Sequence, residues 1–186
     1  MADMLATPED LASLLQQDLD TATATLVIEA ATAVVQAACG QRIVQVVDDE
    51  SELMGTTDSW LPLPQRPVTA VASVTVDGHP VTDWARFGSR LFRRDGWASC
   101  PHVPSSVVVV NTHGYPPGSQ ELQLARSAVL SLAAGAYAAP AGVAREQIDD
   151  YSVQYEAASA ALEASPALKA SLRRQYGQRG GLVRVG

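Results

Sequence analysis

The densest group of residues that could bind a metal is an acidic run of Asp48, Asp49, Glu50 and Glu52. Carboxylate oxygens suit hard cations such as magnesium and calcium. The spacing of these acids matches no ion-binding loop motif. A solvated acidic connection between two elements is therefore the stronger interpretation, and we expect no metal there.

The other possible metal ligands are spread along the chain: His79, His102, His113 and the two cysteines, Cys39 and Cys100. Zinc sites space their ligands in short pairs, and a single Cys-x-His step does not meet that requirement. Two cysteines make no disulfide framework, which favours the cytoplasm of the producing cell as the place of synthesis. Cys39 ends an apolar segment and is expected to be a small buried residue.

Motifs that pair a nucleophile with a base are absent from the sequence. It has no Gly-x-Ser-x-Gly, His-Glu-x-x-His or Gly-x-Gly-x-x-Gly pattern. Lys169 is the sole lysine and does not follow a glycine-rich loop, which removes a Walker-type phosphate loop. We expect no enzymatic activity, no cofactor and no required metal.

Arginines and aromatic residues are concentrated between positions 84 and 97. The residues are Trp84, Arg86, Phe87, Arg90, Phe92, Arg93, Arg94 and Trp97. This composition is typical of nucleic-acid grooves and of protein interfaces. Asp83 and Asp95 partly neutralise the group, so a solvated hairpin face is the alternative.

Charge is distributed unevenly. The chain has 13 basic and 20 acidic residues, a net charge of −7, which argues against a general nucleic-acid binder. No acid follows Glu163, whereas five cations do: Lys169, Arg173, Arg174, Arg179 and Arg184. Residues 1–163 therefore carry −12, because −7 minus +5 is −12. An acidic body with a basic end is typical of a docking segment.

Four segments of the chain have helical signals. Thr7 and Pro8 begin the first helix, and a second helix over 21–39 ends at Gly40. The polar residues of the second helix fall on one narrow stripe, so most of its circumference is apolar. One core rarely covers so much of a helix, and we expect a subunit interface on its apolar residues and on the alanine-rich third helix. The residues assigned to that interface are Val27, Ala31, Val34, Ala38, Leu132, Ala134 and Ala136.

The third helix is expected to begin after Ser119 and to end near Pro140. Tyr151, Val153 and Tyr155 alternate and predict a short extended segment. Ser165 and Pro166 start a last short helix through Tyr176, which we expect to lie outside the main core.

Between the second and third helices the period changes to two. Every second residue from Val68 to Val76 (Val68, Ala70, Ala72, Val74 and Val76) is apolar, and the residues between are Thr69, Val71, Ser73 and Thr75, which predicts a half-buried strand. Further strands are expected near 81–86, 90–94 and 107–110, with hairpin turns at 77–78 and 95–96.

These elements predict an α+β fold. A helical core bundle of three to four helices contains a small antiparallel β unit inserted between helices 2 and 3. The expected parts are 1–41 and 114–164 for the core, 42–113 for the β unit, and 165–186 for a docking helix and tail. The 186 residues are 47% apolar but only 5% aromatic, so the core is thin and help from neighbouring subunits is expected. We expect no signal peptide at the start, and the uncharged run 127–144 is too weakly apolar to predict a membrane span.

The order of these motifs resembles the head-to-tail connector (adaptor) proteins of long-tailed bacteriophages. Two helices and a β insertion precede His113-Gly114-Tyr115-Pro116-Pro117 and an alanine-rich helix. Further short motifs resemble the actinophage branch: 74–78 (VTVDG), 94–97 (RDGW), 149–153 (DDYSV) and 172–176 (LRRQY).

The resemblance implies a structural virion protein without catalytic residues. Such proteins form a ring of twelve copies that docks on the portal, extends the DNA channel without specific DNA binding, and joins the next neck or tail component. The C-terminal segment would dock on the portal through Leu168, Leu172, Arg173, Arg174, Tyr176, Arg179 and Arg184. Its place would be the capsid–tail neck of the virion, after assembly in the host cytoplasm. The alternatives are a stopper or tail-completion ring, or a small soluble enzyme or binding domain.

Overall fold

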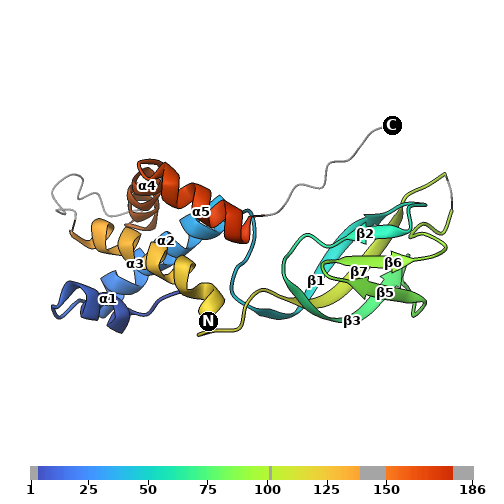
Figure 1. The fold of residues 1–186 in the computed structure, drawn as a ribbon, viewed down its shortest axis with the longest axis horizontal. Coiled ribbons are helices and arrows are strands. Elements are labelled where there is room, and N and C mark those ends of the chain that lie inside the picture. Colours follow the sequence, from blue (N-terminus) through green and yellow to red (C-terminus); the bar gives the residue numbers. More distant parts are fainter. Residues whose placement is uncertain (1–3, 101, 139–149, 178–186) are drawn as a thin grey trace. The chain divides into compact units, whose positions relative to one another are not determined.

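The chain divides into two compact units (Figure 1). The computed structural model describes residues 4–100, 102–138 and 150–177. One unit contains residues 1–40 and 117–186 and is helical in its described part; the other contains residues 41–116 and is built of strands. The predicted α+β class, with an antiparallel β unit inserted between two helices, is confirmed.

The helical unit is arranged around its longest described helix. Its elements are α1 (Pro8–Leu15), α2 (Thr21–Cys39), the 3-10 helix η1 (Gln120–Leu122), α3 (Gln123–Ala138), α4 (Asp150–Glu163) and α5 (Pro166–Tyr176). Helix α2 packs against each of the other four α-helices. It is long and apolar enough to cross a membrane, but the core helix of a folded domain meets the same criterion, and half of that stretch is buried in the chain.

Local signals explain where the first helices begin and end. Thr7 and Asp10 form a capping box at α1, in which each side chain accepts a hydrogen bond from the other residue's backbone N–H. The Asp20 carboxylate caps α2 by accepting from the Thr23 N–H at 2.8 Å. Gly40 ends α2 in the left-handed conformation, with φ of 70°.

Two expectations for the second half of the helical unit are wrong. Residues 151–155 belong to α4 and are not an extended segment. Alternation of two tyrosines with a valine was too short a pattern to exclude a helix. The expected capping of α3 by Ser119 is also wrong. Ser119 precedes the 3-10 turn η1 and makes no side-chain capping hydrogen bond, and α3 follows η1 at Gln123. The predicted stop at Pro140 lies outside the described residues.

The β unit contains two antiparallel sheets. The four-stranded sheet has the order β1 (Val46–Gly55), β7 (Ser105–His113), β3 (Val68–Val76) and β4 (His79–Pro80). The three-stranded sheet has the order β2 (Trp60–Pro62), β6 (Arg90–Arg93) and β5 (Trp84–Phe87). Strand β1 lies at one edge of its sheet and pairs with β7.

The acidic run is part of a strand, which corrects the expected connection. Asp48, Asp49, Glu50 and Glu52 all lie in β1. Charged side chains are common on edge strands because they discourage pairing with another chain. The composition that suggested a connection is therefore compatible with an edge strand.

Strand β3 does not follow the simple alternation that its sequence predicts. Its pairing with β7 shifts register between Val68 and Ala70 and again between Val71 and Ser73. These bulges leave Ala70 and Ala72 exposed and turn Val71 toward the core. A single extra residue reverses the inward and outward faces of a strand, and one sequence does not reveal where such residues fall.

One of the two predicted hairpin turns is correct. Asp77 and Gly78 both have positive φ, at 49° and 79°, and join β3 to β4. Asp95 and Gly96 form a turn after β6 that joins no strand pair. The second hairpin turns at residues 88–89, between β5 and β6.

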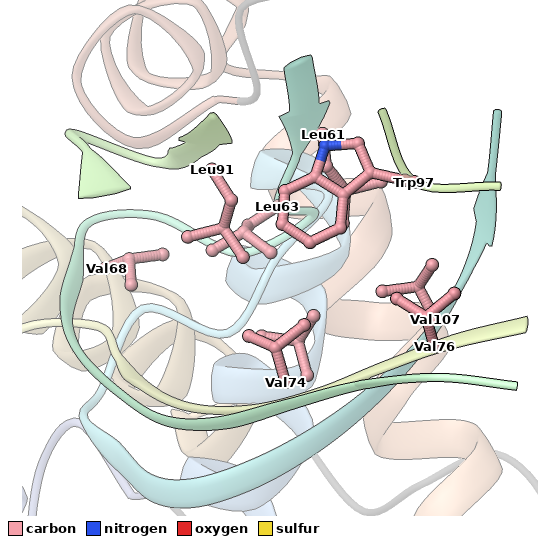
Figure 2. Packing of buried hydrophobic residues seen from close by; sticks show 9 residues of the cluster. Leu61, Leu63, Val68, Val74, Val76, Leu91, Trp97 and Val107 are labelled. Atoms are coloured by element: carbon pink, nitrogen blue, oxygen red, sulfur yellow. The ribbon is translucent and has the colours of Figure 1, made fainter. Parts of the chain in front are cut away.

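The core of the β unit lies between the two sheets (Figure 2). Leu61 and Leu91 of the three-stranded sheet, with Trp97, face Val74 and Val107 of the four-stranded sheet. Trp97 is fully buried and its indole N–H donates to the Ser59 carbonyl at 3.2 Å. Each sheet therefore has one face in this core and one face directed away from it.

Candidate assembly surfaces

Helix α5 presents an apolar side to its own helical unit. Leu172 and Tyr176, both assigned to portal docking from the sequence, are at most 1% exposed. The Tyr176 hydroxyl donates to the Glu121 carbonyl and accepts from the Ala125 N–H at 3.4 Å, at the start of α3. These two side chains hold α5 to the unit, so the expectation that this helix lies outside the main core is wrong.

The outward side of α5 is cationic. Arg173 and Arg174 are exposed, and Leu168 is half-buried. Arg173 donates from Nε to the Ala38 carbonyl at 3.2 Å, where it complements the negative C-terminal end of α2. Lys169 forms an ion pair with Glu163 across the turn between α4 and α5. Of the predicted portal-docking cations, Arg179 and Arg184 lie outside the described residues.

The residues assigned to a subunit interface divide into two groups. Val27, Ala31, Val34 and Leu132 are at most 4% exposed within the single chain, so they belong to its core and offer no surface to a neighbour. Four helices pack against α2 and cover much of its apolar circumference, more than the predicted three-to-four-helix bundle provides. Ala38, Ala134 and Ala136 are half-buried and remain accessible at the helix surface.

Apart from Ala38, the apolar residues of α2 that stay accessible are different from those predicted. Ala22, Leu26 and Ala37 are exposed, and Ala33 is half-buried. Their spacing of four, seven and four residues places them along one side of the helix. Conversely, Thr32 of the supposed polar stripe is buried, and its hydroxyl has no hydrogen-bond partner among the described residues.

The four arginines of the 84–97 region form two pairs, and the first pair has hydrogen-bond partners within the β unit. Arg86 donates to the carbonyls of Val68 and Gly88, at 2.9 and 3.2 Å. Arg93 binds both carboxylate oxygens of Asp83 at 3.0 Å. These contacts occupy two guanidinium groups within the β unit itself.

Arg90 and Arg94 are exposed and lie beside an aromatic cluster. Phe87 is directly opposite Arg90 in the β5–β6 pair. Trp60 contacts both Phe87 and Phe92, with ring centroids 5.6 and 5.0 Å apart. Trp60 joins this cluster from β2 and is absent from the predicted group of residues. Its place before a proline-rich stretch was the available signal.

The histidine nearest to a carboxylate is structural. His113 is fully buried, and its Nε2 lies 3.0 Å from Oδ2 of Asp49 on the neighbouring strand. His79, His102 and Cys100 are exposed. Within the described part of the chain, no three histidine, cysteine or acidic side chains come together in a way that could hold a metal ion.

Comparison with solved structures finds a similar fold in a gene transfer agent particle. No protein-family model and no curated protein sequence matches the chain. A chain in the virion of a native gene transfer agent particle matches with a TM-score of 0.52 and 16% identity, over 84% of this chain and 90% of that chain. The two chains share a fold.

Weaker matches come from the same kind of particle. A chain in the neck of a native gene transfer agent particle, computed with C12 symmetry, gives a TM-score of 0.48 and 17% identity, over 79% of this chain and 86% of that chain. A chain in the neck of an empty particle gives a TM-score of 0.47 and 17% identity, over 76% of this chain and 79% of that chain.

The match to the gene transfer agent virion chain includes parts of both units, because either unit alone is shorter than 84% of the chain.

Proposed function

We propose that this chain is a structural protein of a phage-like virion, a head-to-tail adaptor that forms a ring at the neck. The observation that carries the proposal is the fold shared with a gene transfer agent virion chain along nearly the whole length of both chains. The order of sequence motifs that resembles phage adaptors supports it independently, because it was read from the residues alone.

The ring proposal is supported by surfaces that a single copy leaves uncovered. Ala134 and Ala136 near the end of α3, and Leu26 on α2, are accessible apolar side chains on the helical unit. On the β unit, Trp60 and Phe87 are 42% and 58% exposed. Apolar surface of this kind is stabilised by contact with another subunit. The resemblance to adaptors implies twelve copies.

Docking on the portal is assigned to the outward side of α5 and to the residues that follow it. Arg174 is exposed and carries no ion pair within the described residues. Arg179 and Arg184 continue the same positive charge in sequence, with no acid after Glu163. A partner with an acidic groove would attract this segment, and repetition around a ring would add avidity. The net charge of −7 is compatible with a channel along which DNA slides without being held.

The assignment of portal docking is tested by removing residues 178–186, which leaves the core of the helical unit intact. A chain that ends at Gly177 keeps all of α5, including the buried Leu172 and Tyr176. We expect this chain and the Arg174→Glu variant to fold, with unchanged circular dichroism, and to join portal-bearing heads poorly. Arg42→Glu, which makes the same charge change at an exposed position of the β unit, is the control. Wild-type joining by the shortened chain would place the docking surface elsewhere.

An image of the particle tests the function as a whole. Density for this chain should form a ring directly beneath the portal. A ring one level further down would make the protein a stopper or tail-completion component, and absence from the particle would contradict the structural role.

A further inference from the structure

The two sheets of the β unit carry opposite charges. The strands of the four-stranded sheet contain Asp48, Asp49, Glu50 and Glu52 and no lysine or arginine. The strands of the three-stranded sheet contain Arg86, Arg90 and Arg93 and no acid. Such a separation is a property of the unit itself and does not follow from the net charge of the chain.

Register places the exposed acids on the outer face of the four-stranded sheet. Val107 and Val109 of β7 are buried in the core, so Val108 and Val110 face outward. Glu52 pairs with Val108, Glu50 pairs with Val110, and Met54 pairs with Ser106. Glu50, Glu52 and Met54 are exposed, and Met54 is 68% exposed. We call these five residues (Glu50, Glu52, Met54, Val108 and Val110) the acidic face.

The outer face of the three-stranded sheet is aromatic and cationic. Leu61 and Leu91 are buried in the core, so their neighbours Trp60, Arg90 and Phe92 face outward. Trp60 is directly opposite Phe92, and Phe87 is directly opposite Arg90. Arg94 follows β6 and is exposed. We call these five residues (Trp60, Phe87, Arg90, Phe92 and Arg94) the aromatic face.

These two faces lie on opposite sides of the β unit, because each is the outer surface of one of two sheets packed against a common core (Figure 2). Each combines apolar side chains with charge of one sign. The aromatic rings of one face match Val108, Val110 and Met54 of the other, and the two free arginines match the two glutamates. Surfaces that complement each other across a molecule make head-to-tail contacts between copies, and such contacts close into a ring when the rotation from one copy to the next completes a full circle.

We propose that the aromatic face of one copy binds the acidic face of the next copy. This inference rests on the proposed ring and names a contact that builds it. The Trp60 cluster supplies the rigid anchor typical of interface hot spots, since its rings already pack on one another before binding. Arg90 and Arg94 set the orientation by pairing with Glu50 and Glu52 of the neighbouring copy.

A second copy fits the aromatic face better than nucleic acid does. Grooves that follow a nucleic-acid backbone need several free cations. Here the guanidinium groups of Arg86 and Arg93 are held by Val68, Gly88 and Asp83. Arg90 and Arg94 have no side-chain partner among the residues that the structure describes, and the two accessible glutamates of the other face match them in number.

Charge reversal on each face tests the contact with the full-length chain. Arg90→Glu with Arg94→Glu makes the aromatic face acidic, and Glu50→Arg with Glu52→Arg makes the acidic face basic. Each double variant should self-associate at least ~10-fold more weakly than the wild type in sedimentation or native mass measurements. Tryptophan fluorescence checks folding, because all three tryptophans (Trp60, Trp84 and Trp97) lie in the β unit.

Combining the variants gives the decisive result. A chain with all four reversals has both charges exchanged, so it should recover association. An equimolar mixture of the two double variants should also co-assemble, although each variant alone associates weakly. Glu9→Arg with Glu156→Arg makes the same charge change as the acidic-face variant on exposed residues of the helical unit, and it should associate like the wild type.

Three results would overturn this contact. A wild-type chain that stays monomeric at millimolar concentration contradicts it, as does association that both double variants retain. Binding of an oligonucleotide that Arg90→Glu with Arg94→Glu abolishes, while self-association persists, would assign the aromatic face to nucleic acid. The proposed virion function is judged separately by the particle image, which would still show a neck ring if the ring used other contacts.

Discussion

Gly55 occupies a position where a side chain has no room. A Cβ placed there would lie 2.1 Å from the Trp97 carbonyl oxygen and 2.6 Å from Cγ2 of Val107. We expect Gly55→Ala to destabilise the β unit by about 1–3 kcal/mol, toward the upper end because a backbone atom must move. Thermal unfolding followed by tryptophan fluorescence measures it.

Gly135 provides the matched control for that substitution. It lies within α3, and a Cβ there would meet nothing within 4 Å. Gly135→Ala should therefore stabilise the helical unit by up to about 1 kcal/mol, since alanine loses less backbone entropy in a helix. Equal effects of the two substitutions would contradict the packing described at Gly55.

Burial raises the pKa of the Cys39 thiol from 9.0 to about 11, although nearby Arg173 opposes part of the shift. In the folded chain the Cys39 thiol therefore keeps its proton at a pH where the same thiol in the unfolded chain has lost it. The contribution of the protonated thiol to the free energy of unfolding is complete below about pH 9. It falls by about 2–3 kcal/mol as the pH rises toward 11 and beyond. The difference in unfolding free energy between the wild type and Cys39→Ala, measured against pH, isolates it.

Thiol labelling gives an independent test of the same burial. Cys100 is exposed, and Cys39 is buried. At pH 8 one thiol should react rapidly with an aromatic disulfide reagent, and the second should react only after unfolding. Rapid labelling of the Cys100→Ser variant would contradict the buried position of Cys39.

At the scale of elements, α5 is both part of the core and a carrier of surface charge. Leu172 is fully buried, so Leu172→Ala should cost about 2–5 kcal/mol. Tyr176→Phe removes the hydroxyl that binds the start of α3 and should cost about 1 kcal/mol. Denaturant unfolding followed at 222 nm measures both.

Arg174→Ala is the control on the same helix, because its side chain is exposed. We expect a change within about 0.5 kcal/mol. If Leu172→Ala were equally neutral, α5 would not belong to the core of the helical unit.

For the whole molecule, assembly should be sensitive to a charge at the end of α3. Ala134 is half-buried, so Ala134→Arg leaves room for the guanidinium at the surface of a single chain. In a ring that buries this position, an unpaired charge would cost several kcal/mol. We expect a folded chain that fails to form necks, measured by particle yield and native mass. Ala161→Arg, the same substitution at an exposed position of α4, should assemble normally.

Much of the architecture could be predicted from the sequence because it depends on neighbouring residues. The capping box at Thr7, the stop at Gly40, the start of α5 at Pro166 and the turn at Asp77-Gly78 are local features, and each lies where it was expected. The change from a helical to a strand period likewise placed the β unit between α2 and α3. Charge along the chain was also readable, including the basic stretch after Glu163.

Which side of an element faces the core was decided by tertiary structure. Two bulges reversed the faces of β3 over residues 70–72, and strand pairing brought Trp60 beside residues 87 and 92. The packing of α2 against four helices buried Val27 and Ala31, which composition alone had assigned to a neighbour. Burial depends on contacts between residues that are far apart in the sequence. A periodic pattern indicates that a face is apolar, but it does not indicate whether the same chain or another copy covers that face.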